Sequence, residues 1–125
     1  MEQVNHLFQV MTYDIDFAGV VSNIIYIRWL EDLRNLFADQ ILPIGEALQR
    51  GIVSALSWTE IDYLLPITFP DRVEGAMWLS ESGRAKFLFS SEFISQKTGR
   101  PLLEQYNRGF LSHRRRSTRT TPRGV

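Results

Sequence analysis

The fold of this chain is decided by residues 23–37, whose sequence is NIIYIRWLEDLRNLF. Apolar side chains recur in it at spacings of three and four residues, which is the period of an α-helix. Arg28 and Asp32 fall on the other side of the helix at a spacing that lets them pair. The apolar stripe is wide, which predicts a helix largely enclosed by the rest of the protein. Ser22 or Asn23 can serve as its N-cap.

Strand patterns lie on both sides of this helix. Residues 6–13 alternate well enough for a first strand, and a turn-prone stretch at 14–19 leads into the helix. After Pro43, residues 44–50 predict one or two helical turns. The remaining strand predictions are residues 52–65 with a bulge near Thr59, 72–79, 84–95 and 102–111. The order predicts an α+β fold in which an antiparallel sheet covers the helix on one face.

Composition bounds the possible functions. The chain has 125 residues, 44% hydrophobic and 22% charged, which fits one globular domain. It has no cysteine and two histidines, which excludes thiolate chemistry and disulfides and leaves too few ligands for a multi-His metal site. There is no apolar run of about 18 residues and no visible signal peptide, so we expect no membrane span and a cytoplasmic location.

Charge is distributed unevenly along the chain. Fourteen basic residues balance fourteen acidic ones, but residues 113–125 carry five arginines and no acid, so residues 1–112 have a net charge of −5. We expect a folded domain over 1–112, followed by a basic, flexible tail or the end of the last strand over 113–125. The tail is either solvated or in contact with phosphate. Nucleic acid is not favoured as a partner, because no helix-turn-helix, RNP or finger pattern accompanies the charge.

Asp16 is the strongest candidate for a reacting group. It precedes the start of the helix, where unpaired N–H groups and the positive end of the helix dipole point outward. Such an N–H can stabilise an oxyanion, and a nearby carboxylate can attack a carbonyl or take a proton from water. These groups suffice to hydrolyse a reactive acyl bond such as a thioester. The residues alone leave open that Asp14 or Asp16 only caps the turn or the helix.

A family resemblance supports the reactive role. Residues 13–32, YDIDFAGVVSNIIYIRWLED, resemble the hallmark of the 4-hydroxybenzoyl-CoA thioesterase-like hotdog family. The positions in register are Asp16, Gly19, Val21, Asn23, Tyr26, Trp29, Leu30 and Glu31. The resemblance covers about residues 6–112. It implies a hotdog fold, with the sheet wrapped around one long central helix, and acyl-CoA thioesterase activity without a metal or redox cofactor.

The resemblance also implies roles for individual residues. Asp16 would act as nucleophile or general base, and the backbone N–H of Asn23 would bind the oxyanion. The substrate-binding residues that we expect are Gly19, Val20, Tyr26, Arg84 and Lys86. The two basic residues would bind the phosphates of CoA, with Lys97, Arg100 and the tail arginines as further candidates.

The substrate implied is an acyl-CoA or an acyl carrier protein thioester, and the assembly implied is a homodimer or homotetramer with active sites at the dimer interface. A different hotdog arrangement uses a helix glutamate after a histidine–glycine motif. That motif is missing here, so Glu31 and Asp32 are expected on the helix surface or at an interface. The alternative function is a non-catalytic hotdog dimer that binds an acyl thioester or a protein partner.

Overall fold

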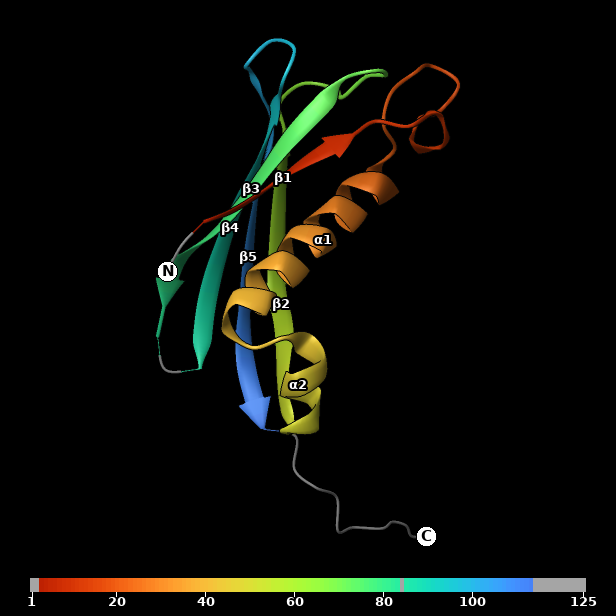
Figure 1. Cartoon of the computed structure of the whole chain (residues 1–125). Helices are drawn as coiled ribbons and strands as arrows, with labels where there is room; N and C mark the ends of the chain where they lie inside the picture. Colours follow the sequence, from red (N-terminus) through yellow and green to blue (C-terminus); the bar gives the residue numbers. More distant parts are fainter. Residues whose placement is uncertain (1–2, 84, 114–125) are drawn as a thin grey trace, which may run out of the picture.

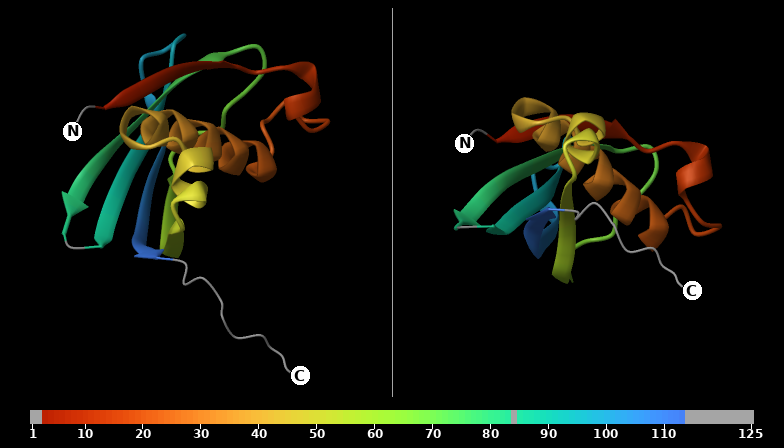
Figure 2. Two further views of the ribbon diagram at one scale, coloured as in Figure 1. Left: turned by 60° about the horizontal axis from the view of Figure 1, so that its bottom comes forward. Right: turned by 90° about the horizontal axis from the view of Figure 1, so that it is seen from below.

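The long helix α1, Asn23–Ile41, lies against one face of a curled antiparallel sheet of five strands (Figure 1). The structure is a computed structural model that describes residues 3–83 and 85–113. The strands are β1 Val4–Gln9, β2 Ile52–Tyr63, β3 Arg72–Ser82, β4 Lys86–Ser95 and β5 Pro101–His113. A short helix α2, Ile44–Gln49, follows α1. Seen from below, the sheet curls around α1 (Figure 2).

Helix α1 forms where the sequence predicts it. Ser22 is the N-cap in an extended conformation, and Leu42, also extended, ends the helix one residue before Pro43. The apolar stripe is buried, as the spacing of its members predicts. Its fully enclosed residues are Ile25, Tyr26, Trp29, Leu30, Leu33 and Phe37. The burial of this stripe is confirmed, but the helix is not enclosed in the single chain, because its other side is exposed.

The sheet has the strand order β1-β3-β4-β5-β2. The strands β3, β4 and β5 form a meander. Strand β2 pairs with β5 and is an edge strand of the described sheet. A register shift between Leu56 and Trp58 confirms the bulge expected near Thr59. On β3, Gly75 allows close packing, because a Cβ there would lie 2.8 Å from the ring of Phe8.

Most predicted strand boundaries differ from the observed ones by no more than two residues, and two differ by three or more. The first strand stops at Gln9, because residues 12–14 form a 3₁₀ helix in which the carboxylate of Asp14 accepts a hydrogen bond from the Met11 N–H at 2.9 Å. The strand predicted to end at residue 79 continues to Ser82, and the turn follows at Gly83 and Ala85, the latter with φ of 65°. Local side-chain bonding and a bulge after Leu79 shift both ends.

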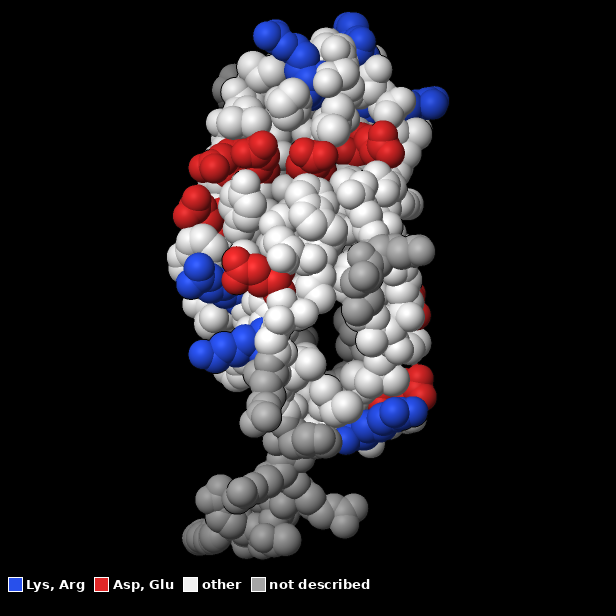
Figure 3. Space-filling view, turned by 90° about the vertical axis from the view of Figure 1, so that its left-hand side faces the viewer, with Lys and Arg blue, Asp and Glu red and all other residues white. Residues whose placement is uncertain are grey.

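The outer face of the sheet, away from α1, carries a row of acids. Glu92 of β4 lies opposite Glu104 of β5, which in turn lies opposite Asp62 of β2. Figure 3 shows an acidic band across the upper part of this face. Like charges directly opposite each other on neighbouring strands repel.

Two searches over the described residues give no positive result. No helix among them is long and apolar enough to cross a membrane. No group of three or more acidic, histidine or cysteine side chains in residues 3–83 and 85–113 is arranged to hold a metal ion.

Candidate functional site

Asp16 lies in a tight loop directly before α1. Its side-chain Oδ1 accepts hydrogen bonds from two backbone N–H groups, that of Ala18 at 2.8 Å and that of Val20 at 3.2 Å. Its own N–H donates to the Val20 carbonyl at 3.0 Å. Gly19 completes the loop with φ of +79°, a conformation that costs glycine little. The carboxylate is thus fixed in direction while it stays exposed, and Oδ2 has no partner among the described residues.

The two aspartates of this region have different roles. Asp14 is buried, and its Oδ2 accepts the Met11 N–H while its carbonyl accepts the Ser22 N–H at 3.2 Å. Asp14 therefore ties the loop to the start of α1. Asp16 is the exposed member of the pair and the one free to meet a ligand.

The loop is held beside the first turn of α1. Ile15 and Val21 form a bridge across its base, and Val20 forms another with Thr68. Asn23 is the first residue of the helix, and its N–H has no acceptor among the described residues. An N–H at this position is an unused donor at the positive end of the helix dipole. The loop and helix thus bring Asp16 and Asn23 to the same end of α1.

The other predicted substrate contacts of this region divide into two groups. Gly19 and Val20 are half-buried in the loop, and the Gly19 carbonyl accepts the Phe69 N–H at 3.1 Å. Tyr26 is buried in the core, with its ring 5.6 Å from that of Tyr63. Burial raises the pKa of the Tyr26 phenol, and a hydrogen bond with the Ile67 backbone lowers it in part. In a single chain Tyr26 is therefore a core residue.

Large apolar side chains surround the loop without being covered. Phe17, next to Asp16, is fully exposed, and Tyr13 is 76% exposed. Ile24 and Ile27, on the outer side of α1, are 75% and 54% exposed. So many exposed large apolar side chains in one short segment are unusual for a lone soluble chain and are typical of an interface.

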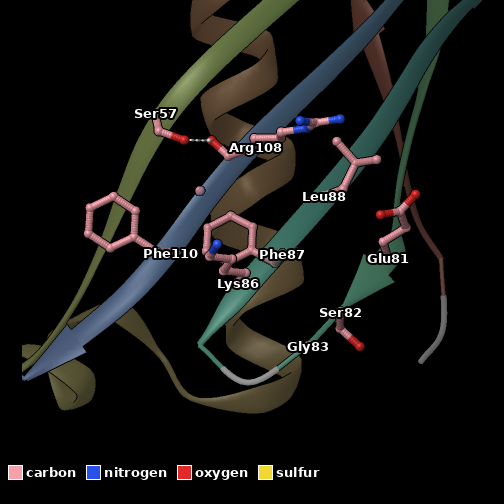
Figure 4. A pocket seen from close by; sticks show the side chains of 10 residues that line it. Ser57, Glu81, Ser82, Gly83, Lys86, Phe87, Leu88, Arg108 and Phe110 are labelled. Carbon is pink, nitrogen blue, oxygen red and sulfur yellow. Dashed lines mark hydrogen bonds between the residues drawn. The ribbon is translucent and has the colours of Figure 1, made fainter.

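A hollow lies on the outer face of the sheet, near the turn between β3 and β4. Its volume is about 610 Å³, and its lining includes Lys86, Arg108, Phe110 and Glu81. In Figure 4 these side chains project from β3, β4 and β5 on the side away from α1. The guanidinium of Arg108 lies 5.3 Å from the ring centre of Trp58. Two cations beside aromatic rings suit a phosphate next to a flat base.

Sequence reasoning found Lys86 of this pair and missed Arg108. Arg108 pairs in register with Leu88 of β4 and Trp58 of β2, and only the strand register brings it to Lys86. Its alternation with Phe110 on one face of β5 was the signal available. Arg84 and the arginines of residues 114–125 lie outside the described residues. Lys97 and Arg100 lie at the turn between β4 and β5, at the other end of these strands.

One chain does not bring all the predicted site residues together. The Asp16 loop lies at the upper end of the molecule, and Lys86 begins β4 at the lower end (Figure 1). The predicted catalytic pair forms one site, and the basic pocket forms another.

Comparison with known proteins places this arrangement in a family. A family model described as the thioesterase-like superfamily matches residues 10–122. This chain belongs to the thioesterase-like superfamily. Membership supports thioester hydrolysis as the general class of reaction. No curated protein matches the chain at a significant level.

Solved structures of thioesterases share the fold of this chain. A 1,4-dihydroxy-2-naphthoyl (DHNA)-CoA thioesterase from Staphylococcus aureus is 17% identical, with a TM-score of 0.80 over 91% of this chain and 76% of that one. A gentisyl-coenzyme A thioesterase is 22% identical, with a TM-score of 0.77 over 88% and 89%. A 4-hydroxybenzoyl-CoA thioesterase mutant with bound 4-hydroxybenzoyl-CoA is 18% identical, with a TM-score of 0.79 over 94% and 88%. The hotdog fold expected from the sequence is confirmed.

Proposed function

We propose that this protein hydrolyses acyl-CoA thioesters to a free acid and CoA, with Asp16 as nucleophile or general base. The observation that carries the proposal is the fixed carboxylate of Asp16 beside the unused N–H of Asn23. A carbonyl oxygen that accepts the Asn23 N–H is polarised, and the N–H stabilises the charge that develops on it. The free Oδ2 of Asp16 then attacks the carbonyl carbon or deprotonates the attacking water.

Asp16 caps its own turn through Oδ1, but it does not cap the helix, and its Oδ2 stays available for chemistry. A capping aspartate directs its carboxylate to the N–H groups of the helix that follows. The Asp16 carboxylate instead bonds within its own loop, and the N-cap position belongs to Ser22. The Asn23 N–H is therefore left for a substrate.

The proposed substrate is a CoA ester because of the basic outer pocket. Lys86 and Arg108 would bind phosphates of CoA, and Phe110 offers a surface for the adenine. Loop residues Gly19 and Val20 would contact the thioester region. The acyl carrier protein thioester expected as an alternative substrate, and a cytoplasmic location, remain part of the proposal. In the alternative function, the Asp16 loop and the basic pocket bind a thioester without turnover.

A dimer would complete the site. The Asp16 loop and the basic pocket lie at opposite ends of one chain, so two chains related by a two-fold axis can place one end of each side by side (Figure 1). The exposed apolar residues around the loop and the open edge of β2, 12 residues long, provide the surface for this pairing. We therefore propose a homodimer, or a homotetramer built from it, with active sites at the interface.

Thiol release from a panel of acyl-CoAs of different chain length, branching and aromaticity tests the activity. We expect turnover by the wild type and a loss of about 10²-fold or more in Asp16→Asn. This change keeps an oxygen for the Ala18 and Val20 N–H groups, so the loop should stay intact. Asp32→Asn, which removes an exposed acid from α1, is the matched control and should keep full activity.

The outcomes separate the candidate functions. Turnover that Asp16→Asn retains would remove Asp16 from the mechanism. Binding of CoA esters without turnover would support the non-catalytic alternative. Activity only on carrier-bound acyl groups would change the substrate but keep the reaction.

The dimer is tested by light scattering coupled to size-exclusion chromatography. Ile24→Lys introduces a charge into the apolar surface at the start of α1 and should yield monomers with reduced turnover. Leu7→Lys on the outer face of β1 changes a residue that is 46% exposed and should leave the assembly unchanged. A monomeric wild type that hydrolyses CoA esters would contradict the shared site.

A further inference from the structure

A separate apolar cavity lies at the other end of α1. Its volume is about 440 Å³, within the range of about 300–1,000 Å³ that is usual for small-molecule sites. The last turns of α1, helix α2 and the lower parts of β2 to β5 enclose it. A wall of aromatic rings bounds one side, where Phe37 meets Phe89 edge-on at 4.9 Å and Phe89 meets Phe87 at 5.0 Å.

The side chains of residues 3–83 and 85–113 do not fill this space. Alanines and a glycine line it where larger residues would close it, among them Ala38, Ala47 and Gly83. Aliphatic residues of its lining remain about half exposed, with Ile41 at 57% and Leu48 at 54%. Such side chains lose contact with water when an apolar ligand enters, and this favours binding.

Arg34 supplies an unusual polar group in this apolar lining. It lies one turn before Ala38 on the same side of α1. Its Nη1 pairs with Glu31, but its Nε is buried and has no hydrogen-bond partner among the described residues. Burial lowers the pKa of the Arg34 guanidinium, while Glu31 raises it. A buried donor without an acceptor is costly, so an acceptor that reaches it gains affinity.

We propose that this cavity binds an aliphatic carboxylate, with the carboxylate on Arg34 and the chain along Phe37, Ala38 and Ile41. A neutral chain such as an alcohol or a thioester fits the apolar lining, but it offers the Arg34 Nε a weaker acceptor than a carboxylate oxygen does. The cavity is therefore selective for a free acid.

This site is distinct from the Asp16 site in the same chain. Arg34 is eleven residues after Asn23, which corresponds to about 16 Å along the helix axis. If the proposed function is correct, its free-acid product is a natural ligand here. Binding of the acid itself does not depend on that function.

Calorimetric titration with decanoate below its micelle concentration and with decanol below its solubility limit tests the proposal. The two probes share a chain length and differ in charge. We expect the wild type to bind decanoate at least about tenfold more tightly than decanol. Arg34→Gln, which removes the charge, should weaken decanoate binding about tenfold and leave decanol binding unchanged.

A second variant locates the site. Ala38→Trp fills the cavity from α1, so it should abolish binding of both probes while circular dichroism and the melting temperature show a folded protein. Ala18→Ser, in the exposed Asp16 loop, is the control and should bind both probes like the wild type.

Three results would overturn the proposal. The first is no decanoate binding by the wild type. The second is unchanged binding in folded Ala38→Trp, which would place the ligand elsewhere. The third is equal loss of decanoate and decanol in Arg34→Gln, which would show that the charge of Arg34 is not recognised. Failure of thioester hydrolysis would leave all three measurements valid, because none uses turnover.

Discussion

The two ends of α1 differ in how they are packed. In the first half, Ile25, Trp29 and Leu33 are buried among β1, β3 and β4, and Phe8 stacks on Trp29 at 4.8 Å. In the last turns only Phe37 is buried, and Ile41 is largely exposed. The first half therefore anchors the fold and can hold a rigid polar site at its N-terminus. The second half leaves space, which allows a ligand to enter.

The largest expected contrast between these ends is in stability. Trp29→Ala removes a ring that packs on Phe8 and Phe93, and should lower the free energy of unfolding by about 3–5 kcal/mol. Ile41→Ala at the loosely packed end should change it by no more than about 0.5 kcal/mol. Urea denaturation of both variants measures the difference. Equal losses would mean that both halves of α1 contribute equally to the core.

Glycines sharpen the same comparison. In Gly75→Ala the new methyl group would lie 2.8 Å from Phe8 and 3.0 Å from Phe93, so overpacking should cost about 1–3 kcal/mol. Gly45→Ala in α2 meets no atom within 4 Å and should stabilise the protein by about 0.5–1 kcal/mol. Thermal melting of the two variants should show shifts of opposite sign. Shifts of the same sign would contradict the difference in packing.

Alkaline pH provides a milder test of the packed end. Because the pKa of Tyr26 is raised in the folded protein, the unfolded chain ionises first as the pH rises past about 10. The stability due to the neutral phenol is complete below that pH and is lost as the pH rises toward the folded pKa. Tyr26→Phe should therefore lose less stability than the wild type between pH 8 and pH 11. The same loss in both proteins would show that Tyr26 is not the group responsible.

The two ends of the outer face of the sheet also differ, in this case in charge. Its upper part carries the acidic row of Asp62, Glu92 and Glu104, and its lower part carries Lys86 and Arg108 (Figures 3 and 4). Glu104→Gln removes the middle charge of the row and should stabilise the protein by about 0.2–1 kcal/mol. The gain should shrink in 0.5 M salt, because salt screens the repulsion. A loss of stability at low salt would show that the row does not repel.

Much of the fold could be predicted from the sequence because its signals are local. The stripe of α1 and the alternation of Phe87, Phe89 and Phe93 on β4 each repeat over several turns or residues. The ends of β1 and β3 could not be predicted, since a side-chain hydrogen bond from Asp14 and a bulge after Leu79 set them. Hydrophobic pattern alone carries no information on either.

The candidate site was predictable only in part. Asp16 and Asn23 are seven residues apart, so the loop and helix start that join them are read from one short segment. Arg108 meets Lys86 through strand register, which depends on how distant segments pair. The cavity beside Arg34 depends on the path of α1 across the sheet. No pattern within a short segment of sequence predicts that path.

The strand order β1-β3-β4-β5-β2 also affects how the chain folds during synthesis. Residues 52–63 leave the ribosome long before residues 101–113, their only strand neighbours in the described sheet. Throughout that interval β2 exposes both of its edges, and its pairing requires closure of a long loop, which slows folding. A nascent chain that stalls before residue 101 is therefore prone to aggregate. Synthesis of β5 therefore limits how long the edges of β2 stay unpaired.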